Sequence, residues 1–217
     1  MIVTDSVQAY LAASRPEPDP LLAEMEAHGE RDGVPIVVPE TGSLLQILAL
    51  ARGARRILEV GTAIGVSTLY LARALPADGV IVSFEIDPAR HATARGYLER
   101  AGVLDRADLR LQDARTGLAA LEGPFDMAFI DGVKAQYGDY LDALLPLIGP
   151  GGVLAVDNVL ASGTVAEGRG NAEWSDEDVA GLRAFNERLL TDERLTGTVT
   201  PVGDGVLIAV RDPWTPA

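Results

Sequence analysis

The chain has 217 residues, of which 47% are hydrophobic and 23% charged, with a formal net charge of −14 and no cysteine. This composition excludes disulfides, thiolate nucleophiles and sulfur-ligated zinc, and it argues against intrinsic disorder. The acidic balance and the lack of a basic stripe disfavour a protein that binds duplex nucleic acid. No apolar run approaches the length of about 20 residues that a membrane-spanning helix needs. We expect a single-domain cytoplasmic protein without a secretory signal.

The first 35 residues are expected to form a helical extension in front of the main domain. Apolar residues recur at helical spacing in two segments, which the proline-rich breaker 15–20 separates. Asp19 is placed to cap the second helix and Pro20 to begin it. A short extended piece, 36–39, then leads into a third helix. These helices are expected over residues 3–14, 20–30 and 43–52.

From residue 56 onward, strand patterns alternate with helix patterns. Several strands are nearly continuous apolar runs, such as MAFI and VLAV, which are typical of parallel strands covered on both faces. The last two strands flank the turn Gly203-Asp204-Gly205 and indicate an antiparallel hairpin. Strands are expected over residues 56–60, 80–85, 107–111, 125–131, 152–156, 197–202 and 206–210, and helices over 67–75, 88–101, 116–122, 137–148 and 175–191.

This order of elements predicts an α/β fold. We expect a Rossmann-like, doubly wound and mostly parallel seven-stranded sheet, with a C-terminal antiparallel hairpin and helices on both faces. Residues 1–217 should form one domain, with 1–35 as its N-terminal extension. The polar loop 162–173, which contains several glycines, closely follows VLAVDN and is expected to be a lid.

Two glycines, Gly61 and Gly65, lie between the first strand of the alternating region and its helix, in ILEVGTAIGVST. Glycines there let the backbone and the helix N-terminus approach a ligand, although a tight turn alone also requires glycine. Neither the GxGxxG spacing nor a phosphate-binding lysine motif is present. Glu85 ends the next strand, from which a carboxylate can reach ribose hydroxyls. Together these residues predict a nucleoside ligand without phosphates, and S-adenosylmethionine fits that description.

Two further strands end in side chains that carry oxygen, in FIDGVKAQY and VLAVDN. Asp131, Asp157 and Asn158 should converge at the carboxyl edge of the sheet, beside the nucleoside site. Two carboxylates and an amide suit a hard divalent ion such as Mg²⁺, with Mn²⁺ or Ca²⁺ as alternatives. The competing interpretation is that these residues cap turns and helices, as Asp and Asn often do.

Lys134 follows Asp131 by three residues and is the candidate general base. A nearby divalent cation and partial burial favour the neutral form of a lysine, which can accept a proton. The competing interpretation is a salt bridge between Lys134 and Asp131. The two histidines, His28 and His91, are expected to be structural or solvated. No GxSxG motif supports a serine hydrolase.

The segments ILEVGTAIGVSTLYLARALP, FIDGVKAQY, VLAVDNVLASGTV and VGDGVLIAV resemble the cation-dependent O-methyltransferase family, which includes catechol and caffeoyl-CoA O-methyltransferases. The resemblance spans residues 37–211. It implies S-adenosylmethionine as the methyl donor, a divalent metal and a homodimer. It also implies roles for individual residues: Lys134 as catalytic base, Asp131, Asp157 and Asn158 as metal ligands, and Val37, Glu59, Gly61, Thr62, Ser67, Glu85, Ala114 and Asp131 as cofactor contacts.

Three positions bear on the methyl acceptor. Gln112 stands where the family commonly has glycine, and Ala161 stands where it commonly has an aromatic residue. The second change is expected to open or reshape the acceptor pocket. Trp174 is the only clear aromatic residue of the substrate-recognition loop.

The expected reaction is transfer of the methyl group to a hydroxyl of a catechol-like or phenolic small molecule. One alternative is methylation of a hydroxylated wobble uridine in tRNA, for which Arg52, Arg55 and Arg56, joined by Arg169, could form a small basic patch. A second alternative is a sensor that binds S-adenosylmethionine without catalysis. The pair of acids together with Lys134 argues for the enzyme.

Overall fold

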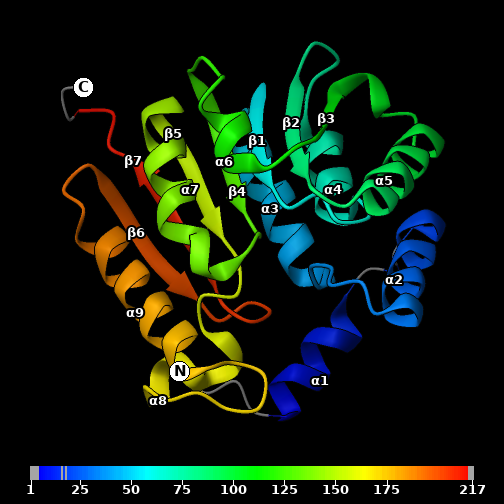
Figure 1. Ribbon diagram of the computed structural model, residues 1–217. Helices are drawn as coiled ribbons and strands as arrows, with labels where there is room; N and C mark the ends of the chain where they lie inside the picture. Colours follow the sequence, from blue (N-terminus) through cyan, green and yellow to red (C-terminus); the bar gives the residue numbers. More distant parts are fainter. Residues whose placement is uncertain (1–4, 16, 18, 215–217) are drawn as a thin grey trace.

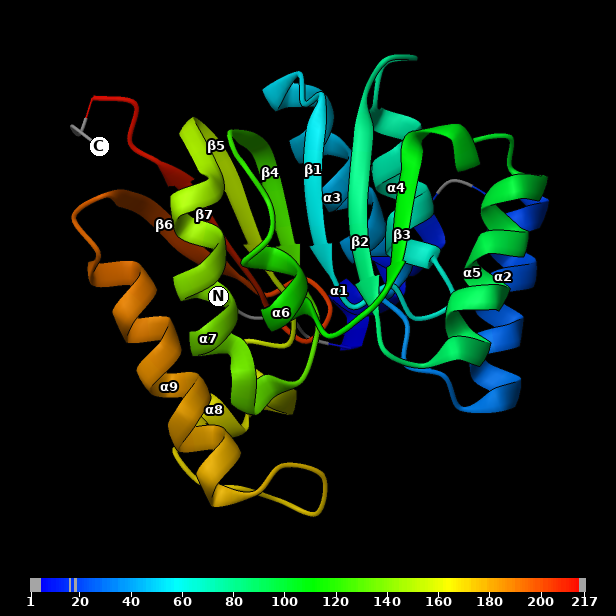
Figure 2. The ribbon, with the colours of Figure 1, turned by 45° about the horizontal axis from the view of Figure 1, so that its top comes forward.

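A seven-stranded sheet forms the centre of the protein. The structure is a computed structural model that describes residues 5–15, 17 and 19–214. The strand order is β3-β2-β1-β4-β5-β7-β6 (Figures 1 and 2). β1 to β5 run parallel, whereas β7 is antiparallel to β5 and β6, as predicted. The strands are β1 (Arg56–Val60), β2 (Val80–Glu85), β3 (Ala107–Leu111), β4 (Phe125–Ile130), β5 (Ile148–Val156), β6 (Leu195–Thr200) and β7 (Val206–Arg211).

Helices cover both faces of the sheet, which confirms the predicted Rossmann-like, doubly wound α/β class. α3, α4 and α5 lie on one face, with α2 outside them, and α6, α7 and α9 lie on the other (Figure 1). The α-helices are α1 (Asp5–Ser14), α2 (Pro20–Asp32), α3 (Pro39–Arg52), α4 (Val66–Ala74), α5 (Pro88–Arg100), α6 (Ala114–Leu118), α7 (Tyr137–Leu144), α8 (Thr164–Glu167) and α9 (Asp176–Thr191). Short 3-10 helices are η1 (Leu104–Arg106), η2 (Lys134–Gln136), η3 (Leu145–Leu147) and η4 (Ala161–Gly163).

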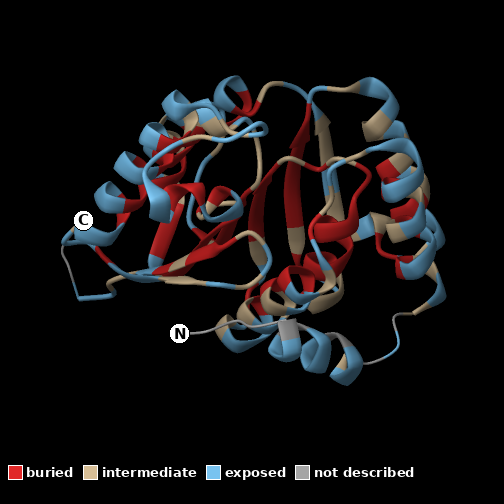
Figure 3. Cartoon of the chain, turned by 90° about the horizontal axis from the view of Figure 1, so that it is seen from below, coloured by how far each residue is buried: buried red, intermediate tan, exposed pale blue. Residues whose placement is uncertain are grey.

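Two apolar layers hold the helices to the sheet, because successive residues of a strand point to opposite faces. Ile57 of β1 and Phe129 of β4 belong to the layer under α2 to α5. Their neighbours Leu58 and Ile130 belong to the layer under α6, α7 and α9. Figure 3 shows buried residues along the strands and the inner helix faces, with exposed residues on the outside. Both faces of the parallel strands are therefore buried, which explains their continuous apolar sequences.

The predicted N-terminal extension contains α1 and α2 in the described residues. Met25 of α2 is fully buried, and Glu24 forms an ion pair with Arg100 of α5. His28 Nδ1 lies 2.7 Å from the hydroxyl oxygen of Tyr97, also on α5. α2 is thus attached to the main body by packing and by polar contacts. Residues 3 and 4, which belong to the first predicted helix, lie outside the described residues.

Several element boundaries differ from the prediction because capping and pairing partners decide them. α3 begins at Pro39 rather than at residue 43, since proline fits the first helical turn after an extended Val38. α6 is Ala114–Leu118 rather than 116–122, because the Asp113 side chain accepts the N–H of Arg115 and caps the helix two residues earlier. β6 begins two residues before its predicted start, where Leu195 pairs with Arg211.

The largest boundary errors concern the connection between α7 and β5. The predicted helix 137–148 ends at Leu144, and η3, which contains Pro146, follows it. β5 begins at Ile148 and includes the Gly-Pro-Gly-Gly stretch, because the pairing register between β4 and β5 shifts there. The predicted lid loop 162–173 also contains regular structure, namely α8 and part of η4.

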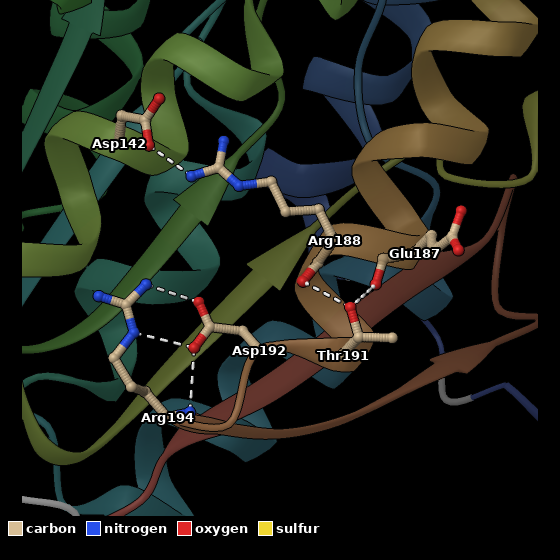
Figure 4. Close-up of polar contacts among 6 residues, drawn as sticks. All are labelled: Asp142, Glu187, Arg188, Thr191, Asp192 and Arg194. Atoms are coloured by element: carbon tan, nitrogen blue, oxygen red, sulfur yellow. Dashed lines mark hydrogen bonds and ion pairs between the residues drawn. The ribbon is translucent and has the colours of Figure 1, made fainter.

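The C-terminal end of α9 is held by charged contacts that Figure 4 displays. Arg188 pairs with Asp142 of α7, which connects two helices on the same face of the sheet. Asp192, just after the helix, accepts two hydrogen bonds from the Arg194 guanidinium, and this partner lowers the pKa of Asp192 to about 2. No helix in the described part of the chain has the length and apolar character to cross a membrane.

Candidate active site

A cleft of about 750 Å³ lies along the carboxyl edge of the parallel strands. Glu85, Gly61, Asp131 and Asp157 stand at or just after the ends of β2, β1, β4 and β5, and all four line it. Because the sheet places these strands side by side in that order, the four residues form a row along the cleft. Asp204, in the turn between β6 and β7, extends this row, since β7 pairs antiparallel with β5.

The cleft brings together seven of the predicted site residues and leaves four beneath its surface. The four are at most 5% exposed, and their side chains support the wall of the cleft from behind. Pro35 and Ile36, directly before Val37, line the cleft. The lining residues among the predicted set are Gly61, Glu85, Ala114, Asp131, Lys134, Asp157 and Asn158, and the buried ones are Val37, Glu59, Thr62 and Ser67.

Glu59 is the centre of a buried hydrogen-bond network under the glycine loop. Its carboxylate accepts hydrogen bonds from the hydroxyls of Ser67 at 2.6 Å, Thr68 at 2.5 Å and Ser83 at 2.5 Å. The Thr62 hydroxyl lies 2.5 Å from that of Ser83. Burial raises the pKa of Glu59 to about 6, although the three hydroxyls oppose the shift. The network connects β1, β2 and α4, and so it fixes the loop between β1 and α4.

Glu85 anchors the other side of the glycine loop. One of its carboxylate oxygens accepts the N–H of Ala63 at 2.8 Å, and the other accepts the N–H groups of Ile86 and Asp87 at 2.9 Å. The side chain is 7% exposed and still lines the cleft. Ile86, by contrast, is 67% exposed at the same strand end. This end of the cleft therefore combines an oriented carboxylate with an open apolar surface.

Asp131, Lys134 and Asp157 form the charged centre of the cleft. The ammonium of Lys134 lies 2.7 Å from Oδ1 of Asp131. Asp157 is only 5% exposed. Its burial is the main cause that raises the pKa of the Asp157 carboxyl above the ordinary value, and the negative charge of Asp131 is the second. The Tyr137 hydroxyl donates to the main-chain oxygen of Asp157 at 3.0 Å. The carboxylates of Asp131 and Asp157 are thus held close together in a partly desolvated environment.

Asn158 begins a turn with an unusual backbone. Its φ is 59°, and Ala161 and Ser162 also have positive φ, a region that residues other than glycine rarely adopt. The N–H of Asn158 donates to Oδ1 of Asp157 at 2.9 Å. The turn is held from behind by Asn186 of α9, whose Nδ2 donates to the Val159 carbonyl at 2.9 Å. Ala161 is buried and is not among the residues that line the cleft.

Several lining residues were missed by sequence reasoning. Asp204 was interpreted only as a hairpin turn, yet it accepts a hydrogen bond from the side chain of Asn158 and another from the Ser162 N–H. Tyr140 lies within the predicted helix 137–148 and was not predicted as a site residue, and its hydroxyl donates to Oε1 of Gln136 at 2.7 Å. The antiparallel hairpin was a usable signal for Asp204, because its turn must return to the carboxyl edge of the sheet. Others in the lining are Ala63, Ile86, Arg90, Asp113, Arg115 and Glu173.

The remaining charged residues of interest lie away from the cleft. His28 contacts Tyr97 and Asp32, and His91 lies 3.2 Å from the Leu109 carbonyl. Arg56 begins β1, at the opposite edge of the sheet, and its guanidinium donates to the carbonyl of Pro124. Its neighbours Arg52 and Arg55 form ion pairs with Asp126 and Asp78. Arg169 pairs with Glu167 and does not line the cleft.

The donor set at the cleft centre consists of two carboxylates and one amide. No group of three or more His, Cys, Asp or Glu side chains that could hold a metal ion occurs in the described part of the chain. The predicted set of Asp131, Asp157 and Asn158 falls outside that kind of group because its third member is an asparagine. Oxygen donors with two negative charges nevertheless suit a hard divalent cation.

A sequence model described as O-methyltransferase matches residues 17–212. The chain belongs to the O-methyltransferase family.

Relatives of this O-methyltransferase span much of its length. The catechol O-methyltransferase of Niastella koreensis is 36% identical over 89% of this chain and 90% of its own. Tricin synthase 2 of Oryza sativa subsp. japonica is 37% identical over 80% of this chain, and the match spans 62% of that plant protein. The crystal structure of an O-methyltransferase from Bacillus cereus in complex with SAH has a TM-score of 0.84 and 33% identity, covering 95% of this chain and 97% of that chain.

Proposed function

We propose that this O-methyltransferase transfers the methyl group of S-adenosylmethionine to one hydroxyl of a catechol-like or phenolic small molecule, with the help of a divalent cation. The observation that carries the proposal is the row of Glu85, Gly61, Asp131 and Asp157 along one cleft. The proposed nucleoside site and the oxygen-rich charged centre would therefore lie next to each other. A catechol O-methyltransferase and a complex with SAH, the demethylated product of such a donor, are among its relatives.

The nucleoside end of the cleft supplies the proposed cofactor contacts. Glu85 would bind the ribose hydroxyls, because its carboxylate is already oriented by three N–H groups. Gly61 would let the cofactor approach the backbone, and Ala114, at the start of α6, would contact the adenine. The other predicted contacts would act at the methionine end of the cofactor. Val37 would contact it through its backbone. The buried residues Glu59, Thr62 and Ser67 would act largely by supporting the glycine loop.

The charged centre fits a divalent cation. Asp131, Asp157 and Asn158 would hold it, with Mg²⁺ as the first candidate and Mn²⁺ or Ca²⁺ as alternatives. Burial of two neighbouring carboxylates is unfavourable unless a cation balances them, and Lys134 alone supplies one positive charge. A bound divalent ion would supply charge stabilisation for a hydroxyl that loses its proton.

Lys134 is the proposed general base. It is the only lysine of the chain, while every other basic residue except the two histidines is an arginine, which cannot give up its proton in proteins. The Lys134 amine would take the proton of the acceptor hydroxyl. The oxygen would then attack the sulfonium methyl group in line, so that the O–C bond forms as the C–S bond breaks.

Transfer of a labelled methyl group from S-adenosylmethionine to catechol tests this function. Lys134→Ala and Asp157→Ala should each lower kcat by about 100-fold or more, while calorimetry finds SAH binding largely retained. EDTA should abolish transfer, and added Mg²⁺ should restore it. Full activity in EDTA would show that the cation has no role, and the absence of transfer to every catechol would remove the proposed reaction.

A homodimer is part of the proposal. Tyr10 and Leu11 of α1 are 70% and 51% exposed, and Ile47 and Leu50 of α3 are 61% and 58% exposed. A second copy that covered these side chains would bury apolar surface that water otherwise contacts. Light scattering coupled to size-exclusion chromatography checks the state, and a monomer at micromolar concentration would contradict it.

A further inference from the structure

The cations that line the cleft are unevenly distributed along its length. Arg90 and Arg115 lie at the end formed by β2 and β3, where Glu85 and Asp113 also line the cleft and Asp113 pairs with Arg115. At the other end, beyond Asp157, the lining carboxylates are Asp204 and Glu173. Among the described residues that line the cleft, the remaining cation is Lys134 at the centre, already paired with Asp131. The end beyond Asp157 therefore presents negative charge without a cation of its own.

The segment that forms this end is acidic well beyond the two lining residues. Residues 162–178 contain five acids and one arginine, a net charge of −4. Arg169 is the arginine, and its charge is engaged by Glu167 at 3.2 Å. Glu173 is exposed, and its carboxylate accepts a long hydrogen bond from the Ser162 hydroxyl at 3.4 Å. Its carboxylate thus remains available to a molecule that enters from this side.

An aromatic residue stands directly beside Glu173. Trp174 lines the cleft and packs against the core layer that contains α7 and α9, so its indole is held in place. The backbone at Glu173 and Trp174 is held as well, because the Asn171 side chain accepts the N–H groups of both residues at 2.8 Å. A flat ring can pack on an indole face, and a cation near it gains further stabilisation.

We propose that the acceptor is a neutral or cationic catechol rather than one with a polyanionic tail, and that Glu173 with Trp174 selects it. This inference rests on the proposed methyl transfer. A tail with an ammonium group would meet Glu173 and the acidic segment 162–178. A tail of phosphates, as in a coenzyme A thioester or in tRNA, would meet like charges at short range and enter a field that repels it.

The test compares acceptors that share one ring and differ in the charge of a short tail. Catechol is the neutral member, with an ethylamine-substituted and an acetate-substituted catechol as the charged pair, and caffeoyl-CoA and bulk tRNA as polyanions. We expect kcat/KM for the amine to exceed that for the carboxylate by at least about ten-fold at low ionic strength. The ratio should shrink at about 0.5 M salt, where exposed charges are screened within a few ångströms.

Glu173→Gln isolates the local contribution. The ratio of the two charged catechols should fall by about two- to five-fold, the size expected for one exposed charge. Glu177→Gln is the matched control, because it removes the same charge from the same acidic segment at a residue that does not line the cleft. It should leave the ratio within the error of the measurement. An equal change in both variants would assign the selection to the general field and overturn the role of Glu173.

The two levels of the proposal fail in different ways. No transfer to neutral catechol by the unaltered protein with Mg²⁺ would contradict the proposed function itself. Transfer to neutral catechol, combined with equal or better use of the carboxylate, the thioester or tRNA, would overturn only the charge selection. The expected result is transfer to catechol and to the amine, with a clear disadvantage for each anionic acceptor.

Discussion

Gly61 lies in direct backbone contact with Asp131. A Cβ atom at position 61 would stand 2.1 Å from the Asp131 carbonyl oxygen, and the φ of Gly61 is 99°. β1 and β4 are neighbours in the sheet, so the loop after one strand touches the first residue after the other. The glycine is therefore required by the close approach of two strand ends, one at the proposed cofactor site and one at the proposed metal site.

Gly61→Ala should disturb both ends of the cleft. The methyl group must push the Asp131 carbonyl away, and the backbone conformation is strained for any residue with a Cβ. We expect a loss of about 2 kcal/mol or more in the free energy of unfolding and a large loss of SAH affinity. Urea unfolding and titration calorimetry measure the two effects.

Gly96→Ala is the control for this substitution. Gly96 lies within α5, and a Cβ there would meet nothing within 4 Å. Because alanine favours helix over glycine, this variant should be unchanged or more stable by about 0.5–1 kcal/mol. Equal stability and SAH binding for the two variants would refute the requirement for glycine at position 61.

Lys134→Arg separates a catalytic base from a structural ion pair. Arginine can keep a positive charge beside Asp131, at the place where the ammonium now lies 2.7 Å from Oδ1. It cannot accept the proton of the acceptor. We expect SAH binding and thermal stability close to those of the unaltered protein, with kcat lower by about 10²–10⁴-fold. Rapid-quench measurement of a single turnover checks the chemical step, and near-normal turnover would leave Lys134 with only its salt bridge.

Glu59 should make stability depend on pH in an unusual direction. Burial raises the pKa of Glu59 from 4.5 to about 6, so between these pH values the folded protein keeps a proton that the unfolded chain releases. The stabilising contribution is therefore complete below pH 4.5 and is lost as the pH rises through about 6. From this shift, the loss amounts to about 2 kcal/mol. Urea unfolding across this range measures it.

Glu59→Gln supplies the comparison for that titration. Glutamine does not ionise, so the free energy of unfolding of the unaltered protein, relative to that of the variant, should decrease by about 2 kcal/mol from about pH 4.5 to about pH 6.5. Other groups titrate in both proteins and cancel in the difference. A difference that stays constant with pH would mean that the Glu59 carboxyl keeps its ordinary pKa when buried.

The residues that end parallel strands were the part of the site that sequence could place. An apolar run that stops at Asp131 or Asp157 marks a strand end, and the βα order brings such ends to one edge. The burial of Glu59 could not be predicted from the sequence, because its hydrogen-bond partner Ser83 comes from another strand. Asp204 was missed for a similar reason, since its contact with Asn158 depends on how the hairpin folds back.

The misplaced boundaries have the same origin. Pro39 and Asp113 favour the starts of helices, yet the apolar periodicity that guided the prediction begins only later in each segment. The composition of the Gly-Pro-Gly-Gly stretch in β5 is typical of a turn. It is part of the strand because β4 lies beside it with a shifted register, which local sequence does not encode.

Asn186 should control the shape of the turn that presents Asn158. Its side chain is 8% exposed, and Nδ2 donates to the Val159 carbonyl, the group directly after the proposed ligand. Asn186→Asp has nearly the same size but offers no N–H to that carbonyl when ionised. We expect this variant and Asn186→Ala to lose about 1–3 kcal/mol of stability and to bind Mn²⁺ several-fold more weakly than the unaltered protein. Electron paramagnetic resonance of free Mn²⁺ measures the affinity without reference to turnover.

Glu187→Gln is the control, because the neighbouring residue is exposed on the same helix and should change neither quantity. The two Asn186 variants then separate a hydrogen bond from packing. If Asn186 acts only by filling space, the Asp variant should bind Mn²⁺ as the unaltered protein does, and the Ala variant alone should be weaker. If the donated hydrogen bond holds the turn, both variants should be weak, and full Mn²⁺ affinity in Asn186→Asp would contradict that role.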